Sequence, residues 1–288
     1  MLGHPAYLNG GIYPPCSLGL QYFRDSRGYP QTWSRPMRLA LWQGPSPAAD
    51  IDAACAQAEA ALAAASAMGA SALVLPEVWL HGYNQPDIAA RAMGLDSPPL
   101  RRLSAAAEAA RTALVVGYAE RDGDRVFNSA ACFGPDGALL CNYRKVQLYG
   151  PRERAIYTPG DSLPVFQLGG KTTAILICYD VEFAPHVKSL SDRGATLILC
   201  PTANMAPFTH VARHTVPAMA ANHGLSIAYA NYCSTEGDLT YIGSSLISGP
   251  HGEILAQAGE TPTLLVAEIP PRDPARVSTQ SADLRVLK

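Results

Sequence analysis

The chain has 288 residues, a formal net charge of −2 and an apolar content of 48%. Such a chain is long enough for one large domain or two small ones with a substantial hydrophobic core. Charged residues make up only 16% of the sequence, so it offers no basic surface for nucleic acid and no polybasic segment for a membrane. We therefore expect small molecules, or further copies of the chain, as partners.

The seven cysteines are scattered along the chain, and no two have CxxC spacing. An odd number of scattered cysteines predicts reduced thiols, and neither a disulfide framework nor a zinc site. The N-terminus lacks the charged start and apolar core that are typical of a secretory signal. The Ala-rich run 60–76 is typical of an amphipathic helix that leads into a strand, and not of a membrane span. We expect a cytoplasmic protein without a metal site.

Residues 1–36 differ from the rest of the sequence, because they are rich in Gly, Pro and Tyr and show no sustained periodicity. They are predicted to be an N-terminal extension outside the core fold, and residues 37–288 are predicted to form one domain. A second interpretation is an arm that docks on a partner subunit.

The first half of the domain alternates between strand and helix patterns. Strands are predicted over 37–43, 71–77 and 114–120, and helices over 50–68 and 100–113. Asp50 and Asp52 stand near the start of the first helix, where carboxylates suit the helix dipole. Two further strands flank the turn at 134–137 in "FGPDGALL".

The second half repeats this alternation, with strands over 171–180, 195–201 and 225–232 and helices over 185–193 and 209–223. A second hairpin turns at 249–252 in "SGPHGEIL", and the last strand ends near Ile269. The alternation predicts an α/β fold in which helices cover the sheets. The similar hairpins suggest two similar halves, although Gly-Pro-x-Gly is also a common turn.

Three predicted buried segments end in a reactive side chain: "LVLPE" in Glu77, "CNYRK" in Lys145 and "ILIC" in Cys178. In layered α/β folds the C-terminal ends of strands converge on the crevice that binds ligands. A thiol becomes nucleophilic when a base takes its proton or a cation lowers its pKa. Glu77 is the candidate base, and Lys145 is the candidate stabiliser of the thiolate and of an oxyanion.

These segments resemble the nitrilase superfamily of carbon–nitrogen hydrolases, over essentially Met37 to Ile269. The matching motifs are "PEVWLHGYN" around Glu77, "YRK" at Lys145, "YTPGD" at 157–161, "CYD" at Cys178, "PTANMAPF" at 201–208 and "AYANYCSTEGDLTYIGSSLISGPHGEIL". The resemblance implies a four-layer α-β-β-α sandwich, a Glu–Lys–Cys triad, no cofactor, and a homodimer or larger homo-oligomer.

The resemblance also implies the roles of further residues. Glu153 stands where the family often has a second glutamate that positions the substrate and supports the lysine, and the Tyr179 N–H would complete the oxyanion site with Lys145. The candidate pocket walls, by motif position, are Tyr83, Tyr179, Phe183, Asn204, Met205 and Phe208.

The implied activity is cysteine-dependent hydrolysis of a small linear amide to an acid and ammonia. An amide is favoured over a nitrile because Tyr-Asp follows Cys178, where nitrilases of the superfamily usually have Trp-Glu. Hydrolysis of a nitrile or of an N-carbamoyl amine remains an alternative. A non-catalytic binding or regulatory member of the fold is the alternative from another class.

Each candidate residue also has an ordinary structural interpretation. Cys178 alone resembles a core cysteine, Lys145 a solvated hairpin end, Glu77 a helix cap, and Glu153 part of a surface charge run. All four structural interpretations would have to hold at once, whereas the ordered motifs need only one explanation.

Two elements depart from the pattern of amidase-like members. Ala184 and Pro185 stand where Pro-Glu is expected, and Ala218 and Ala221 stand where charges are expected. These changes bear on substrate range and subunit geometry more than on the triad.

Two further features have no assigned function. The role of Glu182 stays open between a structural and a substrate-facing one. The pair at 210 and 214 has the spacing of two histidine metal ligands, but lacks the acidic base of a metalloprotease helix.

Overall fold

The computed structural model describes residues 37–285, so the predicted extension 1–36 lies outside the described residues. The strands are β1 (Arg38–Gln43), β2 (Ala72–Val74), β3 (Ala113–Asp122), β4 (Arg125–Phe133), β5 (Leu139–Arg144), β6 (Phe166–Leu168), β7 (Lys171–Ile175), β8 (Leu197–Pro201), β9 (Ser226–Ala230), β10 (Cys233–Glu236), β11 (Leu239–Ile242), β12 (Leu246–Ser248), β13 (Ile254–Gln257) and β14 (Thr263–Glu268). The helices are α1 (Ile51–Ala67), α2 (Ile88–Arg91), α3 (Pro98–Ala110), α4 (Gly150–Ile156), α5 (Ala184–Asp192), α6 (Val216–His223) and α7 (Gln280–Asp283).

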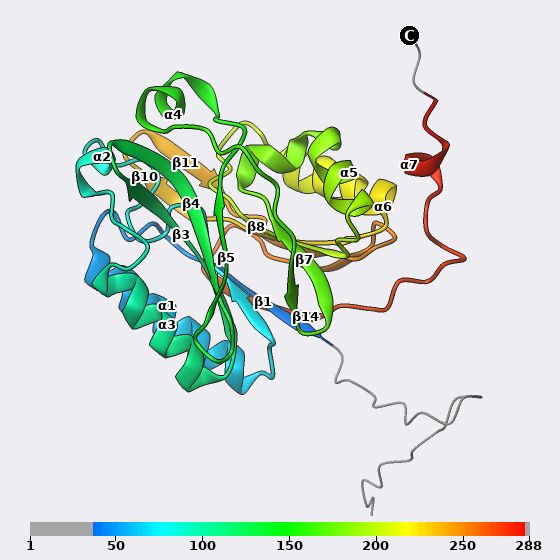
Figure 1. Cartoon of the computed structure of the whole chain (residues 1–288), viewed down its shortest axis with the longest axis horizontal. Helices are drawn as coiled ribbons and strands as arrows, with labels where there is room; N and C mark the ends of the chain where they lie inside the picture. The colour runs from blue at the N-terminus through cyan, green and yellow to red at the C-terminus, as the bar shows by residue number, and fades with distance from the viewer. Residues whose placement is uncertain (1–36, 286–288) are drawn as a thin grey trace, which may run out of the picture. The chain divides into compact units, whose positions relative to one another are not determined.

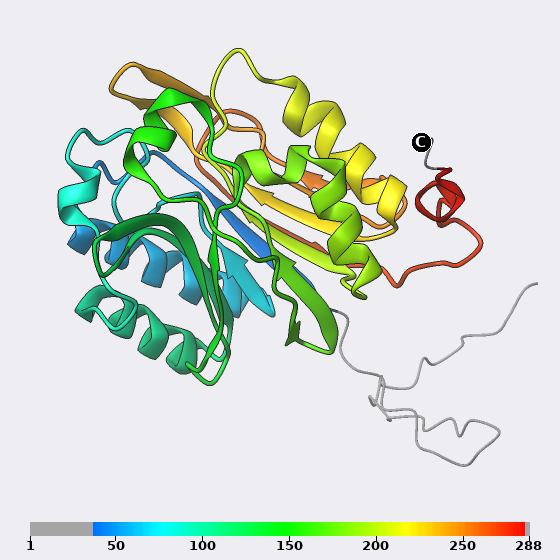
Figure 2. The same cartoon turned by 45° about the horizontal axis from the view of Figure 1, so that its top comes forward.

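Two six-stranded sheets pack face to face and carry helices on their outer sides (Figure 1, Figure 2). The first sheet has the order β14-β1-β2-β3-β4-β5, and the second has the order β13-β12-β9-β8-β7-β6. Strand β1 contacts β9, and β3 contacts β8, across the interface between the sheets. Helices α1 and α3 cover the first sheet, and α5 and α6 cover the second. The predicted four-layer α-β-β-α sandwich is thus confirmed.

The two sheets have the same internal plan. In each sheet three parallel strands, β1-β2-β3 or β7-β8-β9, are followed by an antiparallel hairpin, β4-β5 or β12-β13. The turns of the hairpins match, because Gly137 N–H donates to the Gly134 carbonyl as Gly252 N–H does to that of Gly249. This shared order supports the interpretation of two similar halves.

Successive side chains of β1 point to opposite faces of the first sheet. Both faces of this sheet are covered, because it is one of the two middle layers. Leu39 and Leu41 belong to the core shared with the second sheet, whereas Ala40 packs in the core beneath α1 and α3. All three side chains are fully buried. Apolar residues on both faces of a strand are typical of sheets covered on both sides, and this pattern is consistent with the position of β1 in a middle layer.

Several elements differ from the sequence-based predictions. The strand predicted over 171–180 ends at Ile175, and a 3₁₀ turn covers Cys178–Glu182. The helix predicted over 209–223 begins with a π-helical turn, Val211–Thr215, before α6. No predicted element corresponds to α2, α4 or the β10-β11 hairpin, which are too short for a periodic pattern to form. No helix within residues 37–285 is long and apolar enough to cross a membrane.

His81 adds a pH-sensitive contact to the first layer. Its Nδ1 accepts a hydrogen bond from Ala119 N–H at 3.1 Å, and its Nε2 lies 3.0 Å from the Arg91 carbonyl. This arrangement accommodates only the neutral ring protonated at Nε2, because a proton on Nδ1 would face the amide hydrogen. Burial accordingly lowers the pKa of His81 to about 4.

We predict that acidification destabilises the protein through His81. An unfolded histidine titrates near pH 6.5, so the unfolded state takes up a proton first and stability falls as the pH drops from about 6.5 to 4. The loss should reach about 3 kcal/mol at pH 4, measured by urea unfolding. His81→Gln should remove this part of the pH dependence, and the exposed control His214→Gln should keep it. Equal pH dependence in both variants would contradict the assignment.

Candidate active site

The segment that carries Glu77 crosses β3 at close range. After β2 the chain turns at Val78, which has a φ of +49°, and Leu80 N–H donates to the Gly117 carbonyl at 3.1 Å. A Cβ atom on Gly117 would lie 2.9 Å from the Pro76 carbonyl oxygen and closer still to Val78 N. Only glycine leaves room for this crossing, which directs Glu77 into the interior between the sheets.

Lys145 directly follows β5, and two backbone hydrogen bonds hold its position. Its N–H donates to the Asn128 carbonyl at 2.8 Å, and its carbonyl accepts from Gly160 N–H at 2.8 Å. A Cβ atom on Gly160 would overlap the Arg144 carbonyl oxygen. The glycine of "YTPGD" is therefore required where its chain passes the strand end that carries Lys145.

The Lys145 ammonium is buried between two carboxylates. Its Nζ lies 2.7 Å from Glu77 Oε1 and 2.8 Å from Glu153 Oε1, and all three side chains are at most 1% exposed. Asn128 Nδ2 donates to the same Glu77 oxygen at 2.7 Å. Burial alone would lower the pKa of Lys145, but the charges of Glu153 and Glu77 outweigh it and raise that pKa. Lys145 is therefore a permanent cation in this site.

Glu153 is held on α4 by two further donors. The Tyr83 hydroxyl donates to its Oε1 at 2.7 Å, and Tyr149 N–H donates to its Oε2 at 2.8 Å. These bonds and the one from Lys145 give both carboxylate oxygens of this buried side chain hydrogen-bond partners. The structure thus brings Glu153 into the same cluster as Glu77 and Lys145.

One carboxylate oxygen of Glu77 makes no hydrogen bond within the described part of the chain. Its Oε2 is buried and has no hydrogen-bond partner among residues 37–285. Burial raises the pKa of Glu77 to about 6, against the opposing effect of the Lys145 charge. A carboxylate with a free oxygen and a pKa near neutrality is suited to accept a proton and return it.

Cys178 opens the 3₁₀ turn after β7 and has a φ of +46°, which is uncommon for a residue with a side chain. Asp180 holds this turn, because its Oδ2 accepts from Ile177 N–H at 3.0 Å and from the Tyr143 hydroxyl at 2.8 Å. Its Oδ1 accepts from Gln147 N–H at 2.7 Å. Asp180 therefore links the turn at Cys178 to the chain on both sides of Lys145.

The Cys178 thiol is protonated at rest. Burial and the charge of Glu77 raise its pKa well above the ordinary value, and the Lys145 charge opposes them only in part. A thiol of this kind reacts when a neighbouring base takes its proton during the attack. The free oxygen of Glu77 is the base that this arrangement offers.

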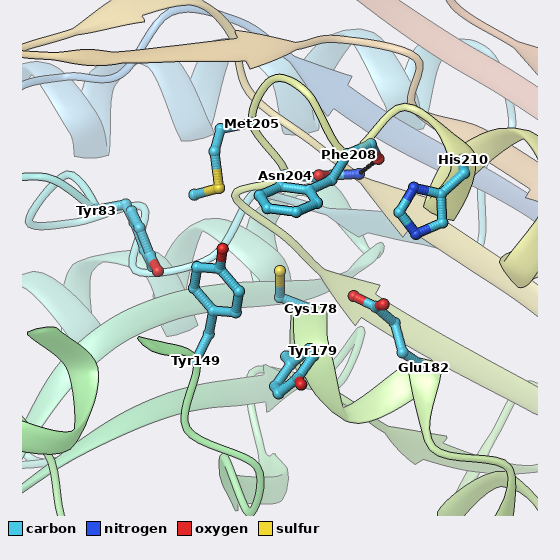
Figure 3. A pocket seen from close by; sticks show the side chains of 9 residues that line it. All are labelled: Tyr83, Tyr149, Cys178, Tyr179, Glu182, Asn204, Met205, Phe208 and His210. Carbon is cyan, nitrogen blue, oxygen red and sulfur yellow. Dashed lines mark hydrogen bonds between the residues drawn. The ribbon is translucent and has the colours of Figure 1, made fainter. Parts of the chain in front are cut away.

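A cavity of about 260 Å³ opens beside Cys178 (Figure 3). Its walls are Tyr83, Tyr149, Cys178, Tyr179, Glu182, Asn204, Met205, Phe208 and His210. The walls include five of the six candidate pocket residues. The sixth, Phe183, packs edge-on against the ring of Tyr179 at 4.9 Å between centroids and does not line the cavity.

Three wall residues were not among the candidates. Tyr149 follows the Lys145 segment, and its position depends on how the loop before α4 folds, which no motif signals. Glu182 lies one turn beyond Cys178, and the sequence alone does not distinguish a structural from a substrate-facing role for it. In the sequence, His210 stands out only because it has the spacing of a metal-ligand pair with His214. Within residues 37–285, however, no group of three or more potential ligands could hold a metal ion.

The fold and this site together define a hydrolase of the α-β-β-α sandwich class, and comparison with known proteins identifies its family. The carbon–nitrogen hydrolase family model matches residues 38–277. A Pseudomonas protegens protein called "Hydrolase in pqqF 5'region" is 38% identical over 82% of this chain and 83% of its own. A nitrilase of Pyrococcus abyssi is 33% identical over 71% of this chain and 78% of its own.

A solved structure resembles the whole domain. The NitN amidase of Nesterenkonia sp. AN1 superposes with a TM-score of 0.80 at 36% identity, over 86% of this chain and 96% of that one. Mutants of that amidase have been solved in complex with butyramide and with the acetamide moiety of fluoroacetamide added to the active-site cysteine. The present chain belongs to the carbon–nitrogen hydrolase family, within the nitrilase superfamily.

We predict that Gly117→Ala impairs hydrolysis by displacing Glu77. The new methyl group would overlap backbone atoms around Glu77, which costs about 1–3 kcal/mol of stability. A displacement of about 1 Å at a catalytic group lowers the rate about 100-fold. Gly259→Ala is the matched control, because a Cβ atom there meets open space. Unfolding in urea and hydrolysis rates of both variants provide the test; an unimpaired Gly117→Ala enzyme would contradict it.

Proposed function

We propose that the protein hydrolyses small linear amides to an acid and ammonia, with Cys178 as the nucleophile. The observation that carries the proposal is the buried Glu77–Lys145–Glu153 cluster, with a free oxygen on Glu77, beside a protonated thiol at the edge of a cavity. The complex of the related Nesterenkonia amidase with butyramide supports an amide as the substrate.

In the first half of the proposed reaction, Cys178 Sγ attacks the amide carbon while Glu77 takes the thiol proton. Negative charge develops on the carbonyl oxygen, where the Lys145 ammonium and the Tyr179 N–H stabilise it. Tyr179 lies in the first turn of a helix, where amide groups have no acceptor within the helix. Glu77 then passes its proton to the nitrogen, the C–N bond breaks, and ammonia leaves a thioester.

In the second half, water attacks the thioester and Glu77 accepts the proton of that water. The collapse of the second tetrahedral intermediate breaks the C–S bond, releases the acid and returns the proton to Cys178. Glu153 does not transfer a proton in this scheme. It positions the Lys145 ammonium, and its bond from Tyr83 connects it to the wall of the cavity.

An amide is favoured over a nitrile because Tyr179 and Asp180 follow the nucleophile. Hydrolysis of a nitrile is the second candidate, since the chain also resembles a nitrilase, and hydrolysis of an N-carbamoyl amine is the third. A purely binding or regulatory role would leave the burial of three charged groups beside Cys178 without a function.

We also propose three features of the protein beyond the site itself. Residues 1–36 are an extension outside the hydrolase domain, and the start of the family match at residue 38 supports this. The six cysteines of the described part are free thiols, which suits a cytoplasmic location. The resemblance to the nitrilase superfamily supports a homo-oligomer.

We predict that Cys178→Ala abolishes ammonia release from butyramide and leaves the fold intact, because the change removes little volume. The matched control is Cys55→Ala on α1, which should retain wild-type turnover. Mass spectrometry of the wild-type enzyme should detect an acyl adduct on Cys178. Turnover of butyronitrile but not butyramide would favour a nitrilase. No turnover of amides, nitriles or carbamoyl amines, together with an unreactive Cys178, would refute catalysis.

We predict an acid limb near pH 6 in kcat/KM for amides. Glu77 must be ionised to accept the thiol proton, so activity is full above its pKa of about 6 and falls about tenfold per pH unit below it. Glu182 also has a pKa raised by burial, so Glu182→Gln is the control and should keep the limb. A limb centred below pH 5, or one lost in that control, would contradict the role of Glu77.

A further inference from the structure

Glu182 faces the substrate cavity from the side of the second sheet. It ends the 3₁₀ turn that begins at Cys178, and its carboxylate points into the cavity between Cys178 and His210 (Figure 3). The remaining wall at this end is aromatic, from Tyr179 and Phe208. A substrate bound at Cys178 therefore meets the Glu182 carboxylate as it extends away from the reacting carbon.

The Glu182 carboxylate has no partner within residues 37–285. No lysine or arginine forms an ion pair with it there, and no hydrogen bond stabilises its charge. Burial raises the pKa of Glu182, and the largest opposing effect is the charge interaction with His210, ahead of that with Lys145. A half-buried carboxylate without a donor is costly, and a cation in the cavity would relieve that cost.

No lysine or arginine lines this cavity among residues 37–285 to supply the cation. Lys145 is already bonded to both Glu77 and Glu153, so the three groups together carry a charge of −1. Glu182 adds a second negative charge. The interior of the site is thus electrostatically suited to a positively charged ligand.

We propose that Glu182 selects amides that carry a primary ammonium group on the acyl side. This inference rests on the proposed amidase function: a primary amide loses only ammonia, so the rest of the substrate is the acyl chain, which occupies the cavity. The ammonium group would form an ion pair with Glu182, while the amide carbon lies at Cys178.

Three amides of equal length test the proposal: 4-aminobutanamide, which is cationic, pentanamide, which is neutral, and succinamate, which is anionic. We expect kcat/KM to fall in that order, with about a tenfold preference for the cationic amide over pentanamide, as for a hydrogen bond to a charged group. Glu182→Gln should reduce this preference about tenfold, and Glu182→Lys should favour succinamate. The matched control Glu108→Gln, on the exposed face of α3, should keep the wild-type preference.

Binding separates this proposal from the proposed function. Calorimetry on the Cys178→Ala protein should show 4-aminobutanamide binding about tenfold more tightly than pentanamide, and Glu182→Gln in that background should remove the difference. Hydrolysis of pentanamide with no cation preference would overturn the role of Glu182 alone. Preferred binding of the cation without hydrolysis by the wild-type enzyme would support Glu182 and overturn the amidase function. Equal losses for all three amides in Glu182→Gln would indicate a structural role and refute selection.

Discussion

The buried ammonium of Lys145 is the constraint on which the site depends. An isolated cation cannot remain charged in the interior, so Glu77 and Glu153 must both lie within hydrogen-bond distance, at 2.7 and 2.8 Å. Each carboxylate in turn needs donors, which Asn128 and Tyr83 supply. Removing one member leaves an unpaired buried charge, which costs about 3–5 kcal/mol. Five residues from four segments of the chain must therefore converge correctly before any chemistry is available.

The two packed sheets bring those segments together from two directions. Glu77 and Lys145 follow strands of the first sheet, whereas Cys178 follows a strand of the second. Hydrogen bonds cross between the halves at the site itself: Glu77 N–H donates to the Thr202 carbonyl at 3.3 Å, and the Tyr232 hydroxyl donates to the Glu77 carbonyl at 2.8 Å. Neither half contains the whole candidate site, so the packing of the two sheets against each other also brings its residues together.

The sequence predicted the parts of the site that a short motif can carry. Glu77, Lys145 and Cys178 each end a buried segment, and this local pattern does not depend on the rest of the fold. Asn128 could not be found in this way, because it lies inside β4 in an ordinary strand pattern and reaches Glu77 only through the pairing of β3, β4 and β5. Helix α4 has seven residues, too few for a helical period to be visible, although Glu153 on it was found by its place in the motif. The cavity walls depend on loop geometry, which explains why Tyr149 was missed and Phe183 lies behind the wall.

The same electrostatics favour the protonated thiol of Cys178, which is the nucleophile of the proposed reaction. Lys145 divides its charge between two carboxylates, so little remains to stabilise a thiolate at Cys178, and burial raises the pKa of that thiol further. In the proposed reaction the proton moves to Glu77 as the bond to carbon forms. Negative charge then develops on the substrate oxygen, where Lys145 can stabilise it. A base with a pKa of about 6 is ionised at neutral pH, yet acidic enough when protonated to give its proton to a departing amine. In this proposal the sulfur of Cys178 is weakly nucleophilic before substrate binds, and it reacts as the substrate carbonyl takes up the developing negative charge.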